Sequence, residues 1–396
     1  MQKITLDTLL QAVSPGGSSA LSSITPLRPA GGDLAAIAPA KYATRVGKTG
    51  TYVFSTRYVE GEPVKTVLVD SSQSQSNRVE QALTHQIIDG NPVLSRIPRV
   101  RVTYTRDSTT EQYTELDLPH RVFDAHIRAG FVNGTAVTAT EEYRSARDAN
   151  PSNAWGLLIL SPMSLLFGSW DSTRRAHQAR WAAALTGETV GVLTDQHLKE
   201  TDLGKGGARV DPVGMSIQLS PKAIQDIANR QKDELSESTY KTFIKDAQAS
   251  VIGFGGIPPT LGQLGLVSCR QIIRSRVLSF ATLRQIRFGQ GSAGDAAIRA
   301  VLAAVAIDGI ARADAELFLR AHCHLVEAGP AVTDLDMRHG KTESVIIPEP
   351  ETADELLSQA LDHAAKVAGL NWDGQVFEVQ GDPNVLAGST DEVEGE

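Results

Sequence analysis

The clearest regular pattern in the chain is a strand followed by a helix that begins with an unusually polar segment. Residues 51–58 (TYVFSTRY) and 64–70 (VKTVLVD) are rich in β-branched and aromatic residues, which predicts two strands, the second almost continuously apolar at its end. Within residues 71–89, apolar Val79, Leu83 and Ile87 then recur at every fourth position, the spacing of one helix face. The pattern therefore predicts a strand–turn–helix unit over residues 64–89.

Elsewhere, strands and helices alternate with long irregular stretches. The first 40 residues are rich in Gly, Ser, Pro and Ala, which predicts a loop with one short helix. Strands are predicted at residues 99–105, 155–160, 215–219 and 321–326, and helices at residues 174–185, 220–250, 295–307, 313–319 and 353–368. This interleaving favours an α+β core decorated by insertions over a clean doubly wound sheet.

Composition restricts the class of protein. The 396 residues are 41% hydrophobic and 21% charged, as in a folded chain of one large domain or two ordinary ones. Two cysteines, Cys269 and Cys323, are too few for a disulfide framework or a four-cysteine zinc site, and they suit a reducing cytosol. No apolar run approaches the roughly 20 residues of a membrane span, and the N-terminus lacks a signal-peptide pattern. We therefore expect a soluble cytoplasmic protein with no membrane partner.

The net charge of −8 conceals an uneven distribution. Residues 343–396 hold 13 acids and one base, so the rest of the chain, with 37 bases and 33 acids, has a net charge of +4. Residues 172–187 and 265–294 contain several arginines and no acid. A solvated face is one explanation for such arginines, and an anionic partner is the other.

Two glycine motifs resemble nucleotide-binding loops. Gly47-Lys48-Thr49 has the ending of a P-loop, but Tyr42 stands where the motif requires its first glycine. Residues 289–294 (GQGSAG) fit G-x-G-x-x-G and precede a helix, although the strand and acid of a dinucleotide site do not follow. A loop that touches nucleic-acid phosphate and a plain turn both remain open for this segment.

Catalytic and metal motifs are weak. His322 and His324 flank Cys323 without a convincing third ligand, which favours buried or edge histidines over a metal site. Residues 171–173 (DST) lack the context of an activated nucleophile and fit a helix N-cap better. The sequence predicts no catalytic residue, metal or cofactor.

Residues 71–78 (SSQSQSNR) are the most informative segment. Capping a helix needs one Ser or Asn, whereas this segment has seven small polar or amide residues followed by an arginine. At a helix N-terminus, hydroxyls, amides and free backbone N–H groups converge, which suits a phosphodiester backbone bound without reading its bases. The alternative is a polar surface turn.

The chain resembles a known family in four segments: 68–83 (LVDSSQSQSNRVEQAL), 156–174 (GLLILSPMSLLFGSWDSTR), 204–212 (GKGGARVDP) and 288–294 (FGQGSAG). Together they look like a CRISPR-associated RAMP protein. The match is to the backbone subunit of the type I-G (formerly I-U) Cascade complex, the Cas-seven family in its Csb-one form. The resemblance runs over most of residues 40–330, and the D-S-x-Q-S-Q-x-N-R segment carries most of its weight.

The resemblance implies an RRM-like (ferredoxin-like) palm with thumb and finger insertions. Residues 1–345 would form this RNA-binding domain, with insertions near 96–150 and 200–260, and residues 346–396 an acidic C-terminal extension, partly helical and then disordered. Copies would stack head-to-tail along a CRISPR RNA into a helical filament that presents the guide for pairing with target DNA in antiviral defence. The implied partners are CRISPR RNA, other copies, the large subunit, the guide-end capping or processing subunit and the target DNA strand.

The same resemblance suggests residue roles. Guide phosphates would be held by Ser71, Gln73, Ser74, Gln75, Asn77 and Arg78, and by the loop of Gly289, Gln290 and Gly291. Lys205 and Arg209 could reach RNA or a neighbouring subunit. About half of a basic pool would touch RNA; the pool is Arg174, Arg175, Arg270, Arg274, Arg276, Arg284 and Arg287. Trp170 either wedges between nucleotides or belongs to the core. Arg78→Ala should weaken RNA binding and lower its salt slope by about one charge.

Two other classes of function remain open. One is an enzyme, either a RAMP-type ribonuclease or a nucleotide-dependent oxidoreductase that uses the glycine loop. The other is a protein-binding scaffold without nucleic acid, which the overall negative charge would suit. Cleavage of RNA with divalent metal, or tight dinucleotide binding, would favour the enzyme.

Overall fold

The computed structural model describes residues 2–43, 51–106, 109–171, 173–174, 180–197, 205–208, 219–246 and 260–385. The chain forms two compact units. The first comprises Met1–His197 with Val267–Gly381, and the second Leu198–Leu266 with Asp382–Glu396. Helices and several sheets are mixed along the chain, so the predicted α+β class is confirmed.

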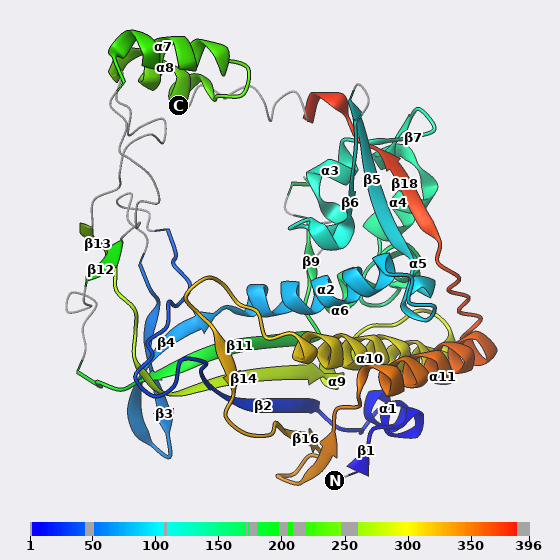
Figure 1. Cartoon of the computed structure of the whole chain (residues 1–396). Coiled ribbons are helices and arrows are strands. Elements are labelled where there is room, and N and C mark those ends of the chain that lie inside the picture. The colour runs from blue at the N-terminus through cyan, green and yellow to red at the C-terminus, as the bar shows by residue number, and fades with distance from the viewer. Residues whose placement is uncertain are drawn as a thin grey trace. The chain divides into compact units, whose positions relative to one another are not determined.

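A nine-stranded sheet is the centre of the first unit. In spatial order its strands are β1 (Gln2–Lys3), β17 (Thr342–Ile346), β16 (Val332–Asp336), β2 (Ala20–Pro29), β14 (Cys269–Ser279), β11 (Leu185–Leu193), β4 (Glu62–Asp70) and β3 (Phe54–Val59), and β15 (Leu325–Glu327) also pairs with β2. Neighbours are antiparallel except β1 and β17. Figure 1 shows the long strands β2, β14, β11 and β4 side by side.

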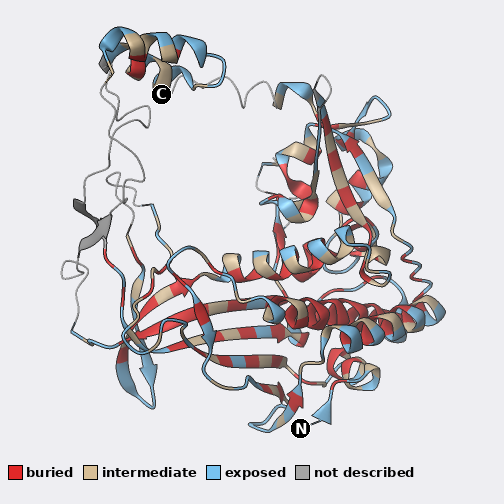
Figure 2. Ribbon diagram, viewed as in Figure 1, coloured by how far each residue is buried: buried red, intermediate tan, exposed pale blue. Residues whose placement is uncertain are grey.

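Helices α2 (Ser72–Ile88) and α10 (Gly291–Ala315) cover one face of this sheet (Figure 1). The alanine-rich α10 is buried almost continuously from residue 294 to residue 311, as Figure 2 shows in red. A helix that is buried on all sides is a core element rather than a surface one. It packs against α2, α11 (Pro350–Ala368) and α1 (Leu6–Val13).

A second sheet of five strands belongs to the same unit. Its order is β6 (Thr109–Thr114), β5 (Arg99–Arg106), β18 (Val376–Gln380), β7 (Phe131–Val132) and β8 (Thr135–Ala136). Short elements surround it or link it to the first sheet: η1 (Leu94–Arg96), η2 (Glu115–Asp117), η3 (Arg121–Phe123), α3 (Ala125–Arg128), η4 (Val137–Ala139), α4 (Glu141–Arg147), α5 (Trp155–Leu160), α6 (Met163–Leu166) and the pair β9 (Ser169–Trp170) and β10 (Arg180–Trp181). Helix α9 (Phe280–Arg284) follows β14 and packs against α1, α10 and β2.

The second unit contains a helix pair and a short strand pair. Helices α7 (Pro221–Arg230) and α8 (Glu237–Asp246) pack together, and the Tyr240 hydroxyl donates to Asn229 Oδ1 at 2.7 Å. Strands β12 (Lys205–Ala208) and β13 (Thr260–Leu264) are antiparallel. The helical prediction for residues 220–250 is confirmed where it is described, whereas residues 215–218 of the strand predicted at 215–219 lie outside the described residues.

Several predictions from periodicity were wrong. Residues 155–160 form helix α5, because a short apolar run buried on most sides has no period that distinguishes a strand from a helix. The helix predicted at 174–185 is replaced, where described, by β10 and the start of β11. The predicted helices at 295–307 and 313–319 are one helix, α10, which ends at Ala315.

The N-terminal segment and the acidic C-terminal part also differ from expectation. The segment predicted as loop contains β2, whose inward Ser23 and Thr25 are buried, and the Thr333 hydroxyl lies 3.1 Å from that of Ser23. The helix predicted at 353–368 is confirmed as part of α11. Strand β18, which was not predicted, pairs in parallel with β5. Both α11 and β18 therefore belong to the packed structure of the first unit.

Candidate nucleic-acid interface

The polar start of α2 divides into two faces. Ser74, Gln75 and Arg78 turn towards the end of β4, while Ser72, Gln73, Ser76 and Asn77 turn towards a cavity. This division follows the period of 3.6 residues, because positions three or four apart share a face. Ser71 is the N-cap, and its hydroxyl accepts from Ser74 N at 3.3 Å.

Asp70, the last residue of β4, is fully buried and organises the inner face. Its carboxylate accepts from Ser74 Oγ at 3.0 Å, from Gln75 Nε2 at 2.7 Å and from Arg78 Nε at 3.0 Å. Arg320, which sequence reasoning missed, also donates to it. A buried carboxylate needs such partners because its desolvation is costly. Three of the eight residues of the polar segment, Ser74, Gln75 and Arg78, are therefore explained by Asp70.

Arg78 ties this cluster to a distant part of the chain. Its Nη1 donates to the Phe318 carbonyl at 2.7 Å and its Nη2 to the Leu319 carbonyl at 2.9 Å. Together with the bonds to Asp70 and Ser74, the fork of the guanidinium is occupied by protein acceptors. The structure thus places Arg78 as a clamp between α2, β4 and the segment after α10.

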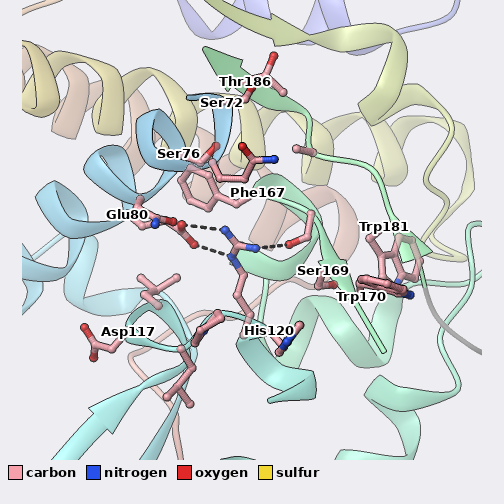
Figure 3. Close-up of a pocket in the computed structure, with 18 of the residues that line it drawn as sticks. Ser72, Ser76, Glu80, Asp117, His120, Phe167, Ser169, Trp170, Trp181 and Thr186 are labelled. Carbon is pink, nitrogen blue, oxygen red and sulfur yellow. Dashed lines mark hydrogen bonds and ion pairs between the residues drawn. The ribbon is translucent and has the colours of Figure 1, made fainter. Parts of the chain in front are cut away.

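The outer face of α2 lines an open cavity of about 810 Å³ (Figure 3). The other walls come from residues 116–121, which follow β6, and from residues 167–170 and 181–186, which surround β9, β10 and the start of β11. Hydroxyl and carboxamide groups dominate the α2 wall. The cavity therefore brings together three of the predicted site residues, Gln73, Asn77 and Trp170, with a loop that sequence reasoning did not include.

An ion pair braces the floor of the cavity. Arg121 donates from Nε to Glu80 Oε1 at 2.5 Å and from Nη2 to Glu80 Oε2 at 2.8 Å, and its Nη1 donates to the Gly168 carbonyl at 2.6 Å. Figure 3 shows these three bonds as dashed lines. Burial raises the pKa of Glu80 although the guanidinium opposes that shift. Arg121 adopts a φ of 48°, a left-handed conformation that is uncommon outside glycine. Three walls are therefore joined by one side chain.

Trp170 is an exposed aromatic side chain on the cavity wall. It is 44% exposed, and the Arg180 guanidinium lies 4.8 Å from the centroid of its ring. The alternative of a core tryptophan is therefore wrong for Trp170, and Trp181 is the buried one of the two. An exposed ring with a cation beside it can stack on a base.

The late glycine loop does not meet the start of α2. Gly289 and Gly291 have φ values of 77° and 70°, which explains the choice of glycine at both positions. The backbone N–H groups of Phe288 and Gln290 both donate to Asp295 Oδ1 at 3.1 Å, so these two are already paired. Helix α10, 25 residues or about 37 Å long, has this loop at its N-terminus. Its other end lies near Arg78, so the two predicted phosphate sites are at opposite ends of the helix.

The basic pool is scattered and partly internal. Arg274 and Arg276 are buried, at 3% and 4% exposure, and both pair with Asp314. The prediction that these two arginines could contact RNA is corrected, because both side chains face the helical layer and stabilise the end of α10. Arg284 donates to the carbonyls of Ala12 and Ser18, at 2.5 and 2.7 Å.

The rest of the pool varies in exposure. Arg174 donates to the Arg147 carbonyl at 3.2 Å and to Asp148 Oδ1 at 3.1 Å. Arg270 and Arg287 are exposed. Arg175, Arg209 and the side chain of Lys205 lie outside the described residues.

The residues of the weak catalytic and metal motifs can be located in the described part of the chain. His322 and His324 are exposed, and no group of three His, Cys, Asp or Glu side chains is placed to hold a metal ion there. Asp171 accepts from the backbone N–H and hydroxyl of Thr173, at 3.3 and 3.0 Å, but no helix begins at Thr173 or Arg174. None of the described helices has the length and apolarity needed to cross a bilayer.

Residues 21–196 match the sequence model of a family described as CRISPR-associated protein GSU0053 (Cas_GSU0053). The match supports a CRISPR-associated protein. No curated protein matches the chain. The matched region includes β4, α2 and every residue that lines the cavity, from Ser72 to Thr186. The candidate interface is thus built within the part of the chain that resembles this family.

Proposed function

We propose that the chain is a CRISPR RNA-binding backbone subunit of a type I surveillance complex, of the Cascade type I-G form, and not an enzyme. The observation that carries the proposal is the position of the cavity, whose lining residues all fall within the region that matches the CRISPR-associated family. A subunit that carries any guide must contact backbone and sugar rather than a fixed base sequence.

In this proposal the main sheet with α2 and α10 corresponds to the RRM-like palm of RAMP proteins. Copies would polymerise head-to-tail along the guide RNA as a ribonucleoprotein, joined by the large subunit and the guide-end capping or processing subunit, and present the guide to target DNA. The segments near 96–150 and 200–260 would be the finger and thumb. The start of α2 and the exposed Trp170 support the proposal because they place polar groups and an aromatic surface in the lining of the same cavity.

The test is to express the chain with its neighbouring genes and a CRISPR array, and then to purify it and sequence the bound nucleic acid. The proposal predicts RNA of uniform guide length in a large assembly. A protein that purifies without RNA, and that does not shift a guide-length RNA in a gel, would contradict it.

A further inference from the structure

Among the residues that the structure describes, the lining of the cavity beside α2 has no unpaired arginine or lysine that could hold a phosphate. Its lining contains one arginine, Arg121, and that guanidinium is already bound by Glu80 and by the Gly168 carbonyl. Asp117 adds a further acid to the wall, and His120 is the remaining titratable group. With histidine neutral, the described lining residues comprise one base and two acids. A polyanionic backbone is therefore not drawn into this cavity by charge.

The neutral polar groups of the lining, of which Ser72, Gln73 and Asn77 are exposed and Ser76 is mostly buried, can both donate and accept hydrogen bonds. Ser72, Gln73, Ser76 and Asn77 present hydroxyls and carboxamides from one wall, and Ser169 lies beside Trp170 on another (Figure 3). Groups of this kind match the sugar hydroxyls and base edges of a nucleotide better than its phosphate. The 2′-hydroxyl of ribose is both a donor and an acceptor, and it is the group that distinguishes RNA from DNA.

The aromatic surface and its cation fit the same ligand. Trp170 exposes a large part of its ring on the cavity wall, so a base can stack there without specific readout. Arg180, which lies over that ring, is itself exposed. Its charge is available to a phosphate at the rim, outside the neutral interior.

We infer that this cavity binds the ribose and base of one RNA nucleotide, and that the α2 side chains Ser76 and Asn77 select RNA over DNA through the 2′-hydroxyl. This inference rests on the proposed function, since it names the part of the guide that the cavity recognises. It departs from the prediction that α2 holds phosphates. Here the positive charge that can meet a phosphate is Arg180 at the rim, and the α2 side chains in the interior distinguish RNA from DNA.

The experiment compares three single-stranded oligonucleotides of one sequence: RNA, DNA and 2′-O-methyl RNA. Fluorescence anisotropy with the full-length protein gives their affinities at several NaCl concentrations. We expect RNA to bind about tenfold more tightly than DNA or 2′-O-methyl RNA, as loss of one buried hydrogen bond gives. Asn77→Ala and Ser76→Ala should remove most of that preference while the salt slope stays the same.

Two further variants separate the interior from the rim. Arg180→Ala should lower the salt slope by about one and weaken RNA and DNA alike. Asn371→Ala removes an exposed carboxamide outside the cavity and should change neither quantity. Because Asn77 is exposed, its replacement leaves the fold intact, and circular dichroism checks this.

Equal affinity for RNA and DNA in the wild-type protein would overturn the inference and leave guide binding in place. A loss of salt slope in Asn77→Ala would also overturn it, because that result assigns a phosphate contact to α2. If the protein binds no RNA at all, the proposed function itself fails, and this outcome is distinct from the other two.

Discussion

The carboxylate of Asp70 organises the residues at the start of α2. Its neighbours Ser74, Gln75 and Arg78 come from the helix that follows, and Arg320 comes from a segment 250 residues away. A charge that is fully buried is tolerated only while its donors remain, and removal of one donor leaves part of the desolvation cost uncompensated. The inner half of the polar segment is therefore required by the fold itself.

Replacement of Arg78 by Ala should lower the free energy of unfolding by about 3 kcal/mol, because the buried Asp70 loses a charged partner and two carbonyls lose their donor. Urea denaturation followed by circular dichroism measures this. Arg78→Lys, which keeps the charge but not the fork, should fall between wild type and Ala. Arg287→Ala, at an exposed position, is the control and should stay within about 0.5 kcal/mol of wild type. Wild-type stability in Arg78→Ala would refute the clamp.

The buried carboxyl of Glu115 should make the stability of the fold depend on pH. Burial raises the pKa of its carboxyl to about 8, from 4.5, although Val100 N donates to Oε2 at 2.7 Å. A raised pKa means that the folded state holds the proton more tightly than the unfolded state. Stability is therefore greatest below pH 4.5 for this group and falls as the pH rises through 8.

The Glu115→Gln variant mimics the protonated carboxyl and should remove that fall, which is about 3 kcal/mol between pH 5 and pH 8. Thermal unfolding at a series of pH values measures it. Glu62→Gln, at an exposed position, should leave the wild-type pH profile unchanged. If both variants retain the same slope, Glu115 is ionised in the folded protein and the account is wrong.

Between elements, the pair of Glu80 and Arg121 connects α2 to the first residue of η3 and to Gly168, the residue before β9. Arg121→Ala should cost about 3 kcal/mol of stability, since Glu80 is left buried without its partner. The double variant Glu80→Gln with Arg121→Gln removes both charges and should cost clearly less than the single change. A double variant that is the less stable of the two would show that the pair does not act as a unit.

Helix α11 is held to α10 by an apolar face. Leu357 is fully buried, so Leu357→Ala should lower the free energy of unfolding by about 3 kcal/mol through loss of packing. Val367, on the exposed side of the same helix, is the matched control, and Val367→Ala should change stability by less than about 0.5 kcal/mol. Similar effects from the two substitutions would mean that α11 does not dock in this way.

The sequence predicts elements well where a long period is present and poorly where contacts decide. The unit of β4 and α2 follows from its pattern, as does most of α10. Residues 155–160 could not be assigned, because six apolar residues fit a buried strand and a buried helix equally. Strand β18 is short and is defined by its pairing with β5, almost 280 residues earlier in the chain.

At the scale of the whole molecule, the candidate site also depends on contacts between distant segments, which a local sequence pattern does not predict. The polar segment at residues 71–78 pointed to a helix that lines a cavity, but its sequence does not say which side chains face Asp70 and which face the cavity. The partners on the two sides come from distant segments: Arg320 donates to Asp70 at the end of β4, and Arg121 donates to Glu80 of α2. An acid as the last residue of an apolar strand was the available signal for a buried partner. The walls from residues 116–121 and 167–170 had no comparable signal.

The whole-molecule claim is that RNA lies along the outer face of α2 and against Trp170. Ultraviolet cross-linking of the purified ribonucleoprotein, followed by mass spectrometry of the peptide–RNA adducts, tests it most directly. The account predicts cross-links at Trp170 and in the peptide that carries residues 72–81. Cross-links confined to the glycine loop at residues 288–294, with none at α2 or Trp170, would contradict it.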